Sequence, residues 1–100
     1  MIKIDVNKEN DDYKSIRIKG HAGYAENGYD IVCASVSSIA ITTINAILSI
    51  DKDSIIYSEE DGLIELGVLK SSDIVNKLLD NMVNMLEELK EQYKKYIEIR

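Results

Sequence analysis

The sequence contains no proline and no tryptophan, and it has a single cysteine and a single histidine. The absence of proline argues against a Pro-rich linker between domains. One cysteine cannot form an internal disulfide, which agrees with a reducing cytosol, so we expect a cytoplasmic protein. One cysteine and one histidine cannot supply a structural zinc site, and we expect neither a metal nor a cofactor.

Membrane and nucleic-acid partners are also disfavoured. The first residues alternate as a strand does, with no basic region followed by an apolar run, so the sequence predicts no secretory signal. We interpret the apolar stretches as too short to span a bilayer, and we expect no membrane partner. The net charge of −6 and the pI near 4.7 repel phosphate backbones, so we expect no nucleic acid. A basic polypeptide suits this charge better.

The length and the apolar pattern predict the fold. One hundred residues, of which 45% are apolar, indicate a single domain over 1–100. A polar turn is expected at 7–12, and alternating apolar residues predict strands at 2–6, 13–19, 54–58, 63–69 and 96–99. Helical spacing predicts one helix that ends near Ile50 and a second that Ser71 or Ser72 caps. The order ββαββαβ predicts an α+β two-layer sandwich, with both helices on one face of a four- to five-stranded sheet, mostly antiparallel or mixed.

One stretch, from residue 20 to residue 37, holds both the histidine and the cysteine. His21 follows the second strand, and Cys33 stands near the start of the first helix. A thiol and an imidazole that meet at such a corner are the minimum pair for catalysis by a cysteine nucleophile. If Asp30 caps the helix, Cys33 lies in its first turn, where free amides favour the thiolate. Alternatively, Cys33 is a small apolar core residue and His21 a structural or exposed histidine.

Other residues of the stretch are candidates for supporting roles. Asp30 caps the helix, orients the imidazole, or does both. Ser37, one turn after Cys33, either hydrogen-bonds within the site or packs against the sheet. The amides of Val32 and Cys33 are candidate donors to an oxyanion. The candidates for contact with substrate are loop residues, namely Gly20, Gly23, Tyr24, Gly28 and Tyr29.

Two segments of this stretch together resemble a known family. They are Gly20-His21-Ala22 and Gly28-Tyr29-Asp30-Ile31-Val32-Cys33-Ala34, the latter followed by Ser35-Val36-Ser37. In this pattern the chain resembles the ribosomal-processing cysteine protease family, Prp, over nearly its whole length. By this resemblance, His21 takes the place of the catalytic histidine and Cys33 that of the nucleophile. Asp30 and Ser37 fall on positions associated with the site.

The resemblance implies a cysteine endopeptidase with a narrow activity. It would remove the short N-terminal extension of bacterial large-subunit ribosomal protein twenty-seven, cutting after an aromatic residue and before an alanine, as ribosome assembly needs. It also implies a homodimer and a glycine loop that covers an apolar peptide groove. An acidic enzyme attracts such a basic substrate. Two alternatives stay open, a non-catalytic peptide-binding module and a thiol redox sensor that act on ribosome-associated partners.

Overall fold

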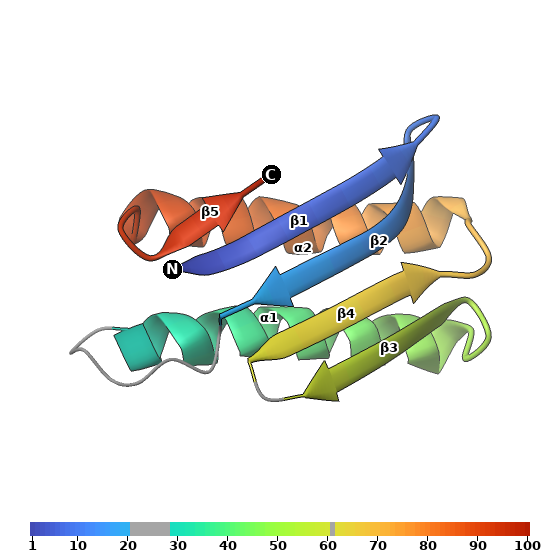
Figure 1. The fold of residues 1–100 in the computed structure, drawn as a ribbon. Coiled ribbons are helices and arrows are strands. Elements are labelled where there is room, and N and C mark those ends of the chain that lie inside the picture. Colours follow the sequence, from blue (N-terminus) through green and yellow to red (C-terminus); the bar gives the residue numbers. More distant parts are fainter. Residues whose placement is uncertain (21–28, 61) are drawn as a thin grey trace.

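The computed structural model of the protein describes residues 1–20, 29–60 and 62–100. In the first helix it describes the side chains only from residue 31 onward. The elements are β1 (Ile2–Glu9), β2 (Asp12–Lys19), α1 (Tyr29–Ile50), β3 (Ile55–Glu60), β4 (Leu63–Val68), α2 (Asp73–Gln92) and β5 (Ile97–Ile99). Figure 1 shows the strands in one layer and both helices behind it. The predicted order and the two-layer α+β architecture are therefore confirmed.

The five strands form one sheet in the order β3-β4-β2-β1-β5. The pairs β1–β2, β2–β4 and β3–β4 are antiparallel, whereas β1 and β5 run parallel. The sheet is thus mixed, as predicted, and β3 and β5 are its two edges. The parallel pair places the last strand next to the first.

The β1–β2 hairpin is tighter than the sequence suggested. Its strands extend to Glu9 and from Asp12, and the two residues between them, Asn10 and Asp11, have φ angles of 52° and 67°. Two successive residues in the left-handed region form the type I′ turn, whose twist matches that of the flanking strands. The prediction of a polar turn over 7–12 is therefore wrong in length, because the strands continue through most of it.

A β-bulge in this hairpin explains how Tyr13 enters the core. Lys8 pairs with Tyr13 and Asn7 with Ser15, which leaves Lys14 as the extra residue. The extra residue shifts the alternation of side chains, so Tyr13 faces the same side of the sheet as Ile16. Tyr13 is accordingly only 4% exposed.

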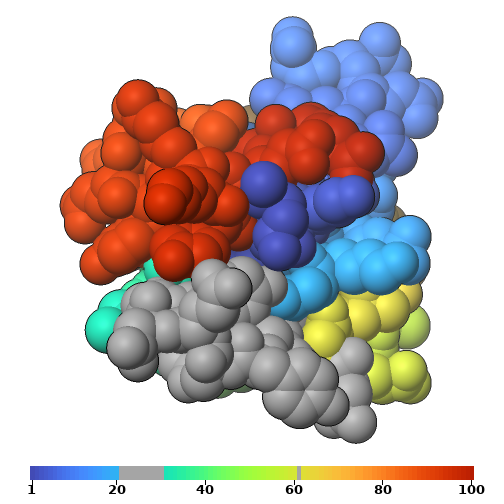
Figure 2. All heavy atoms as spheres, turned by 60° about the vertical axis from the view of Figure 1, so that its left-hand side comes forward, coloured from blue at the N-terminus to red at the C-terminus, as the bar shows by residue number. Residues whose placement is uncertain are grey.

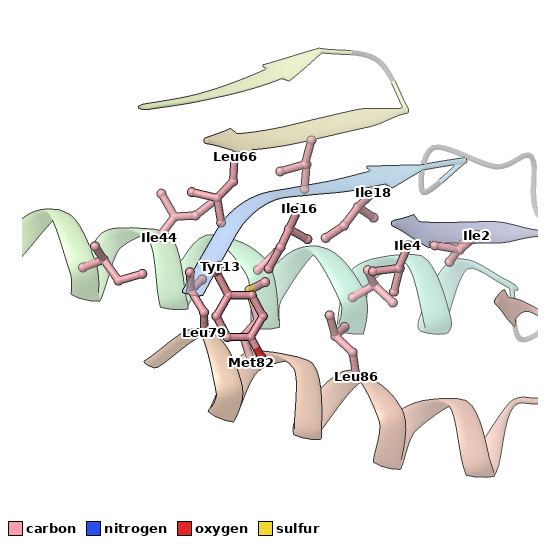
Figure 3. Close-up of a cluster of buried hydrophobic side chains, with 14 of the residues drawn as sticks. Ile2, Ile4, Tyr13, Ile16, Ile18, Ile44, Leu66, Leu79, Met82 and Leu86 are labelled. Atoms are coloured by element: carbon pink, nitrogen blue, oxygen red, sulfur yellow. The ribbon is translucent and has the colours of Figure 1, made fainter. Parts of the chain in front are cut away.

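The core lies between the sheet and the two helices. Figure 3 shows Ile2, Ile4, Ile16, Ile18 and Leu66 from the strands above Ile44, Leu79, Met82 and Leu86 from the helices. Burying one such aliphatic side chain contributes about 1.5–3 kcal/mol to folding. The alternating and helical spacings of the sequence therefore identified the faces that meet.

The two helices begin differently. Ser72 is extended, with φ −156° and ψ 163°, and its hydroxyl accepts a hydrogen bond from the amide of Val75 at 3.2 Å, so the predicted cap of α2 is confirmed. By contrast, α1 already begins at Tyr29. The prediction that Asp30 caps α1 is therefore wrong, because the backbone of Asp30 belongs to the first helical turn.

The first helix is unusually apolar. Its segment Ile31–Ile50 contains no charged residue and has a mean hydropathy of 2.0. By length and composition alone this segment is long enough to cross a membrane, which corrects the prediction that the apolar stretches are too short. Part of this apolar character belongs to side chains of the core, namely Val32, Cys33, Val36, Ala40, Ile44 and Ile47.

Candidate active site

The residue before the histidine is tightly constrained. Gly20 directly follows β2 with a φ angle of +91°, and its amide donates a hydrogen bond to the carbonyl of Gly62 at 2.8 Å. A Cβ atom at this position would lie 2.7 Å from the carbonyl oxygen of Met1, which is shorter than any tolerated contact. Only glycine therefore fits, and the end of β2 is held against both the N-terminal residues and the start of β4.

Sequence reasoning proposed Gly20 for substrate contact and missed this structural role. The Asp61-Gly62 pair signals a turn, but nothing local in the sequence shows that the turn pairs with Gly20. Figure 2 looks onto this end of the molecule, where the N-terminal residues, the end of β2 and the start of β4 lie together. The histidine follows directly from this junction.

The nucleophile candidate is held by the packing of α1. Cys33 is 8% exposed, and the neighbouring helix-face residues Val32 and Val36 are fully buried against the sheet. The thiol thus sits at the margin of the apolar core, on a backbone that cannot rotate without opening that core. This burial is compatible with Cys33 as the nucleophile and with Cys33 as an apolar core residue. In both cases the packing of α1 fixes the position of the sulfur.

The early start of α1 changes what the helix contributes at Cys33. Cys33 is the fifth residue of α1, so it lies in the second turn and not in the first. Its amide comes after the four that lack a helical acceptor, and in a regular helix it donates to the carbonyl of Tyr29. Donation to an oxyanion by the amides of Val32 and Cys33 therefore stays a prediction, and it requires either amide to leave its helical hydrogen bond. The helix dipole, which acts mainly within one turn, is also weaker here than expected.

Two serines follow the cysteine on α1. The Ser35 hydroxyl donates to the carbonyl of Ile31 at 2.8 Å, so it is engaged by its own helix. Ser37 is half-buried and lies four residues after Cys33, which places it on the same side of the helix about 6 Å along the axis. Either predicted role of Ser37 fits this position.

Several predicted residues lie outside the described part of the chain. They are His21, Gly23, Tyr24 and Gly28, together with the side chains of Tyr29 and Asp30. The flanking elements are described, and Figure 1 shows that β2 ends and α1 begins at the same end of the molecule. The predicted strand-to-helix corner is therefore present, and the contact between sulfur and imidazole stays a prediction. Within residues 1–20, 29–60 and 62–100, no cluster of three His, Cys, Asp or Glu side chains is arranged to hold a metal.

The fold of the chain matches solved structures of one family. The ribosomal processing protease Prp of S. aureus with a substrate peptide has a TM-score of 0.93 at 24% identity, covering 100% of this chain and 98% of that one. The same protein with a covalently linked product peptide has a TM-score of 0.88 at 25% identity, with the same coverage. At this level of sequence identity, the likeness shows that this chain and these structures share a fold.

The sequence comparisons agree with the structural ones. Residues 1–98 match the family model described as cysteine protease Prp. The ribosomal processing cysteine protease Prp of Staphylococcus aureus (strain Mu50) is 30% identical over 104 residues, covering 99% of this chain and 97% of that protein. Its namesake in Bacillus subtilis (strain 168) is 28% identical over 87 residues, covering 80% and 78%. With a family model spanning nearly every residue and a relative this similar over the full length, the chain belongs to the Prp family of cysteine proteases.

Proposed function

We propose that this protease removes the short N-terminal extension of bacterial large-subunit ribosomal protein twenty-seven. The cut would fall after an aromatic residue and before the alanine that begins the mature protein. The relatives that support this proposal are named ribosomal processing proteases. The observation that carries it is the covalently linked product peptide in the S. aureus structure, because a covalent intermediate is what a cysteine nucleophile forms.

In the proposed mechanism, His21 and Cys33 share one proton. His21 takes the proton from the thiol, and the sulfur attacks the carbonyl carbon of the scissile bond. The amide of Val32 donates a hydrogen bond to the oxyanion that forms. When the C–N bond breaks, His21 gives its proton to the leaving amine. Water then attacks the thioester with His21 as the base, which releases the carboxylate product and restores the thiol.

The supporting residues act on this pair and on the peptide. Asp30 orients the imidazole, and Ser37 hydrogen-bonds at the base of the site. The glycine-containing loop that follows Gly20, including Gly23, Tyr24, Gly28 and Tyr29, moves to admit the peptide and then closes to exclude water. Cys33 is only 8% exposed, so a peptide carbonyl can reach its sulfur only after a local rearrangement.

The charge of the enzyme supports the same substrate. The chain carries a net charge of −6, whereas a ribosomal protein is basic. Opposite net charges raise the rate of encounter, and this effect weakens as salt screens it. We further propose that the enzyme acts in the cytoplasm as a homodimer. The absence of any charge from residue 31 to residue 50 of α1 supports the dimer.

The test is cleavage of the extended ribosomal protein, with the new N-terminus identified by mass spectrometry. Cys33→Ala, Cys33→Ser and His21→Ala should each lower kcat/KM by at least about a hundredfold, because they remove the nucleophile or its base. Ser35→Ala is the matched control, since its hydroxyl bonds only within its helix. Circular dichroism checks that each variant is folded. Normal cleavage by folded Cys33→Ala would show that the nucleophile is another residue.

A further inference from the structure

We propose that the free edge of β3 binds an extended, basic segment of the substrate as an added strand. The segment lies on the C-terminal side of the cut, because the extension that is removed is short. This inference rests on the proposed function and deepens it, since it names a second place where the enzyme holds the same polypeptide. Four features of β3 carry it.

The first feature is the open edge itself. β3 is the outermost strand, and it pairs on one side with β4 in regular register from Ile55↔Val68 to Glu60↔Leu63. Among the described residues, no strand pairs with its other side. Its residues 56–60 are all exposed. The outer row of amides and carbonyls is therefore available to another extended chain.

The second feature is that the charged residues of β3 lie only at its end, so most of the edge is unprotected. Natural edges are blocked by charged side chains, above all lysine, by proline or by a bulge, or they are very short. The opposite edge, β5, has only 3 residues. β3 has 6 residues, with no Lys, Arg or Pro and no bulge. Instead it exposes Ile56 at 61% and Tyr57 at 43%, which point to opposite faces of the sheet. An added strand would cover apolar surface on both faces.

The third feature is charge. β3 ends in Glu59 and Glu60, which pair in register with the apolar residues Ile64 and Leu63 and form none of the ion pairs of the described residues. The nearby Glu65, by contrast, pairs in register with a cationic residue, Arg17. Glu59 and Glu60 therefore favour a basic guest. They disfavour a second copy of β3, because that strand brings two carboxylates and no cation.

The fourth feature is the position of this edge relative to the site. Glu60 pairs with Leu63, and Leu63 pairs with Lys19 at the end of β2, just before Gly20. The acidic end of β3 thus lies at the end of the sheet where the histidine follows. Strands are spaced by about 4.8 Å, so an added strand would run roughly 14 Å from β2. About five extended residues bridge that span, so the bound segment begins about five residues beyond the cut.

The experiment compares two peptides as substrates of the same enzyme. The short one spans only the cut, and the long one continues for about ten residues with lysine and arginine, enough to cover β3. We expect the wild type to cleave the long peptide with the lower KM. In the double variant Glu59→Lys/Glu60→Lys, the ratio of kcat/KM for the long peptide to kcat/KM for the short peptide should fall about tenfold. This ratio should also depend less on salt concentration than it does in the wild type. Ile56→Lys should lower the same ratio.

The matched control is Glu87→Lys/Glu88→Lys, which makes the same charge change on the exposed face of α2 and should leave the ratio as it is. Equal ratios in wild type and β3 variants would overturn the proposal, and so would a shift from dimer to monomer in the β3 variants, which would assign the edge to a second copy. Failure of the wild type to cleave either peptide would instead overturn the proposed function.

Discussion

At the scale of single residues, Gly20 is a position where no side chain fits without strain. Its φ angle of +91° disfavours any side chain, and a Cβ would meet the backbone oxygen of Met1 at 2.7 Å. Gly20→Ala should therefore lower the free energy of unfolding by about 1–3 kcal/mol. Urea denaturation followed by circular dichroism measures this change.

Gly67 provides the control for that measurement. A Cβ at Gly67 would contact only the side chain of Ile56, at 3.4 Å, and Gly67 has no positive φ angle. Gly67→Ala should change the unfolding free energy much less than Gly20→Ala. Equal losses would mean that the close approach of Met1 does not constrain Gly20.

The residues of the site were predictable to different degrees. The single histidine and the single cysteine drew attention to His21 and Cys33, and membership in a family of cysteine proteases confirms the enzyme over the binding module and the redox sensor. The role of Asp30 as a cap was wrong, because a carboxylate near a helix start suits the first turn as well as the cap. The burial of Cys33 depends on packing against the sheet, which local sequence does not encode.

At the scale of elements, the exposed faces of the two helices differ in charge. From residue 31 onward, the exposed side chains of α1 are all uncharged, namely Ile31, Ala34, Ser38, Thr42, Asn45, Ser49 and Ile50. A groove of about 380 Å³ between α1 and α2 continues this face, with Ile47, Ile50, Ile74 and Leu78 among its lining residues. The exposed face of α2 is instead rich in charge, with Asp73, Lys77, Asp80, Glu87, Glu88 and Glu91. The uncharged face suits contact with a second copy, since two acidic chains meet there without repulsion.

The proposed homodimer can be tested on this face. Ser38→Arg places a charge near the middle of α1, and burying it without a partner should weaken dimerisation by at least about a hundredfold. Light scattering across a concentration series measures the dissociation constant. Asn84→Arg on the exposed face of α2 is the control. An unchanged dimer in Ser38→Arg would place the interface elsewhere.

The elements themselves were largely predictable, because their order follows from alternating and helical spacing. The cap of α2 was predicted as Ser71 or Ser72, because serine is a preferred cap at a helix start. The order of strands in the sheet, the parallel β1–β5 pair and the bulge at Lys14 were not. Each depends on which distant segments pair, and the sequence pattern of one strand carries no record of its neighbour.

At the scale of the whole molecule, two hydrogen bonds of Tyr13 tie the hairpin to α2. The hydroxyl of Tyr13 donates to a carboxylate oxygen of Asp80 at 2.5 Å, and the Asn76 side chain accepts from the Tyr13 amide at 3.1 Å. Burial, the hydrogen bond to Asp80 and the charge of that carboxylate all raise the pKa of Tyr13 above its ordinary value. The neutral phenol is thus favoured in the folded state.

This contact predicts a loss of stability in alkali. Below a pH of about 10 the tyrosine is neutral in both states, so its contribution is complete. Above that pH the unfolded chain ionises first, and the free energy of unfolding falls with rising pH until the folded tyrosine also ionises. Urea midpoints between pH 8 and pH 11 should therefore decline, and less steeply in Tyr13→Phe. Equal slopes in the two proteins, with Tyr93→Phe as the control, would contradict this account.

The parallel pairing of the first and last strands has a consequence for biosynthesis. The amide of Ile2 donates to Tyr96, and the amide of Arg100 donates to Ile4, so β1 is held in place by residues made almost a full chain later. The carbonyl of Met1 in turn occupies the space that a side chain at position 20 would need, directly before the histidine. We therefore expect a nascent chain that still lacks β5 to have an incomplete catalytic corner, and proteolysis to begin only once the final strand has been made.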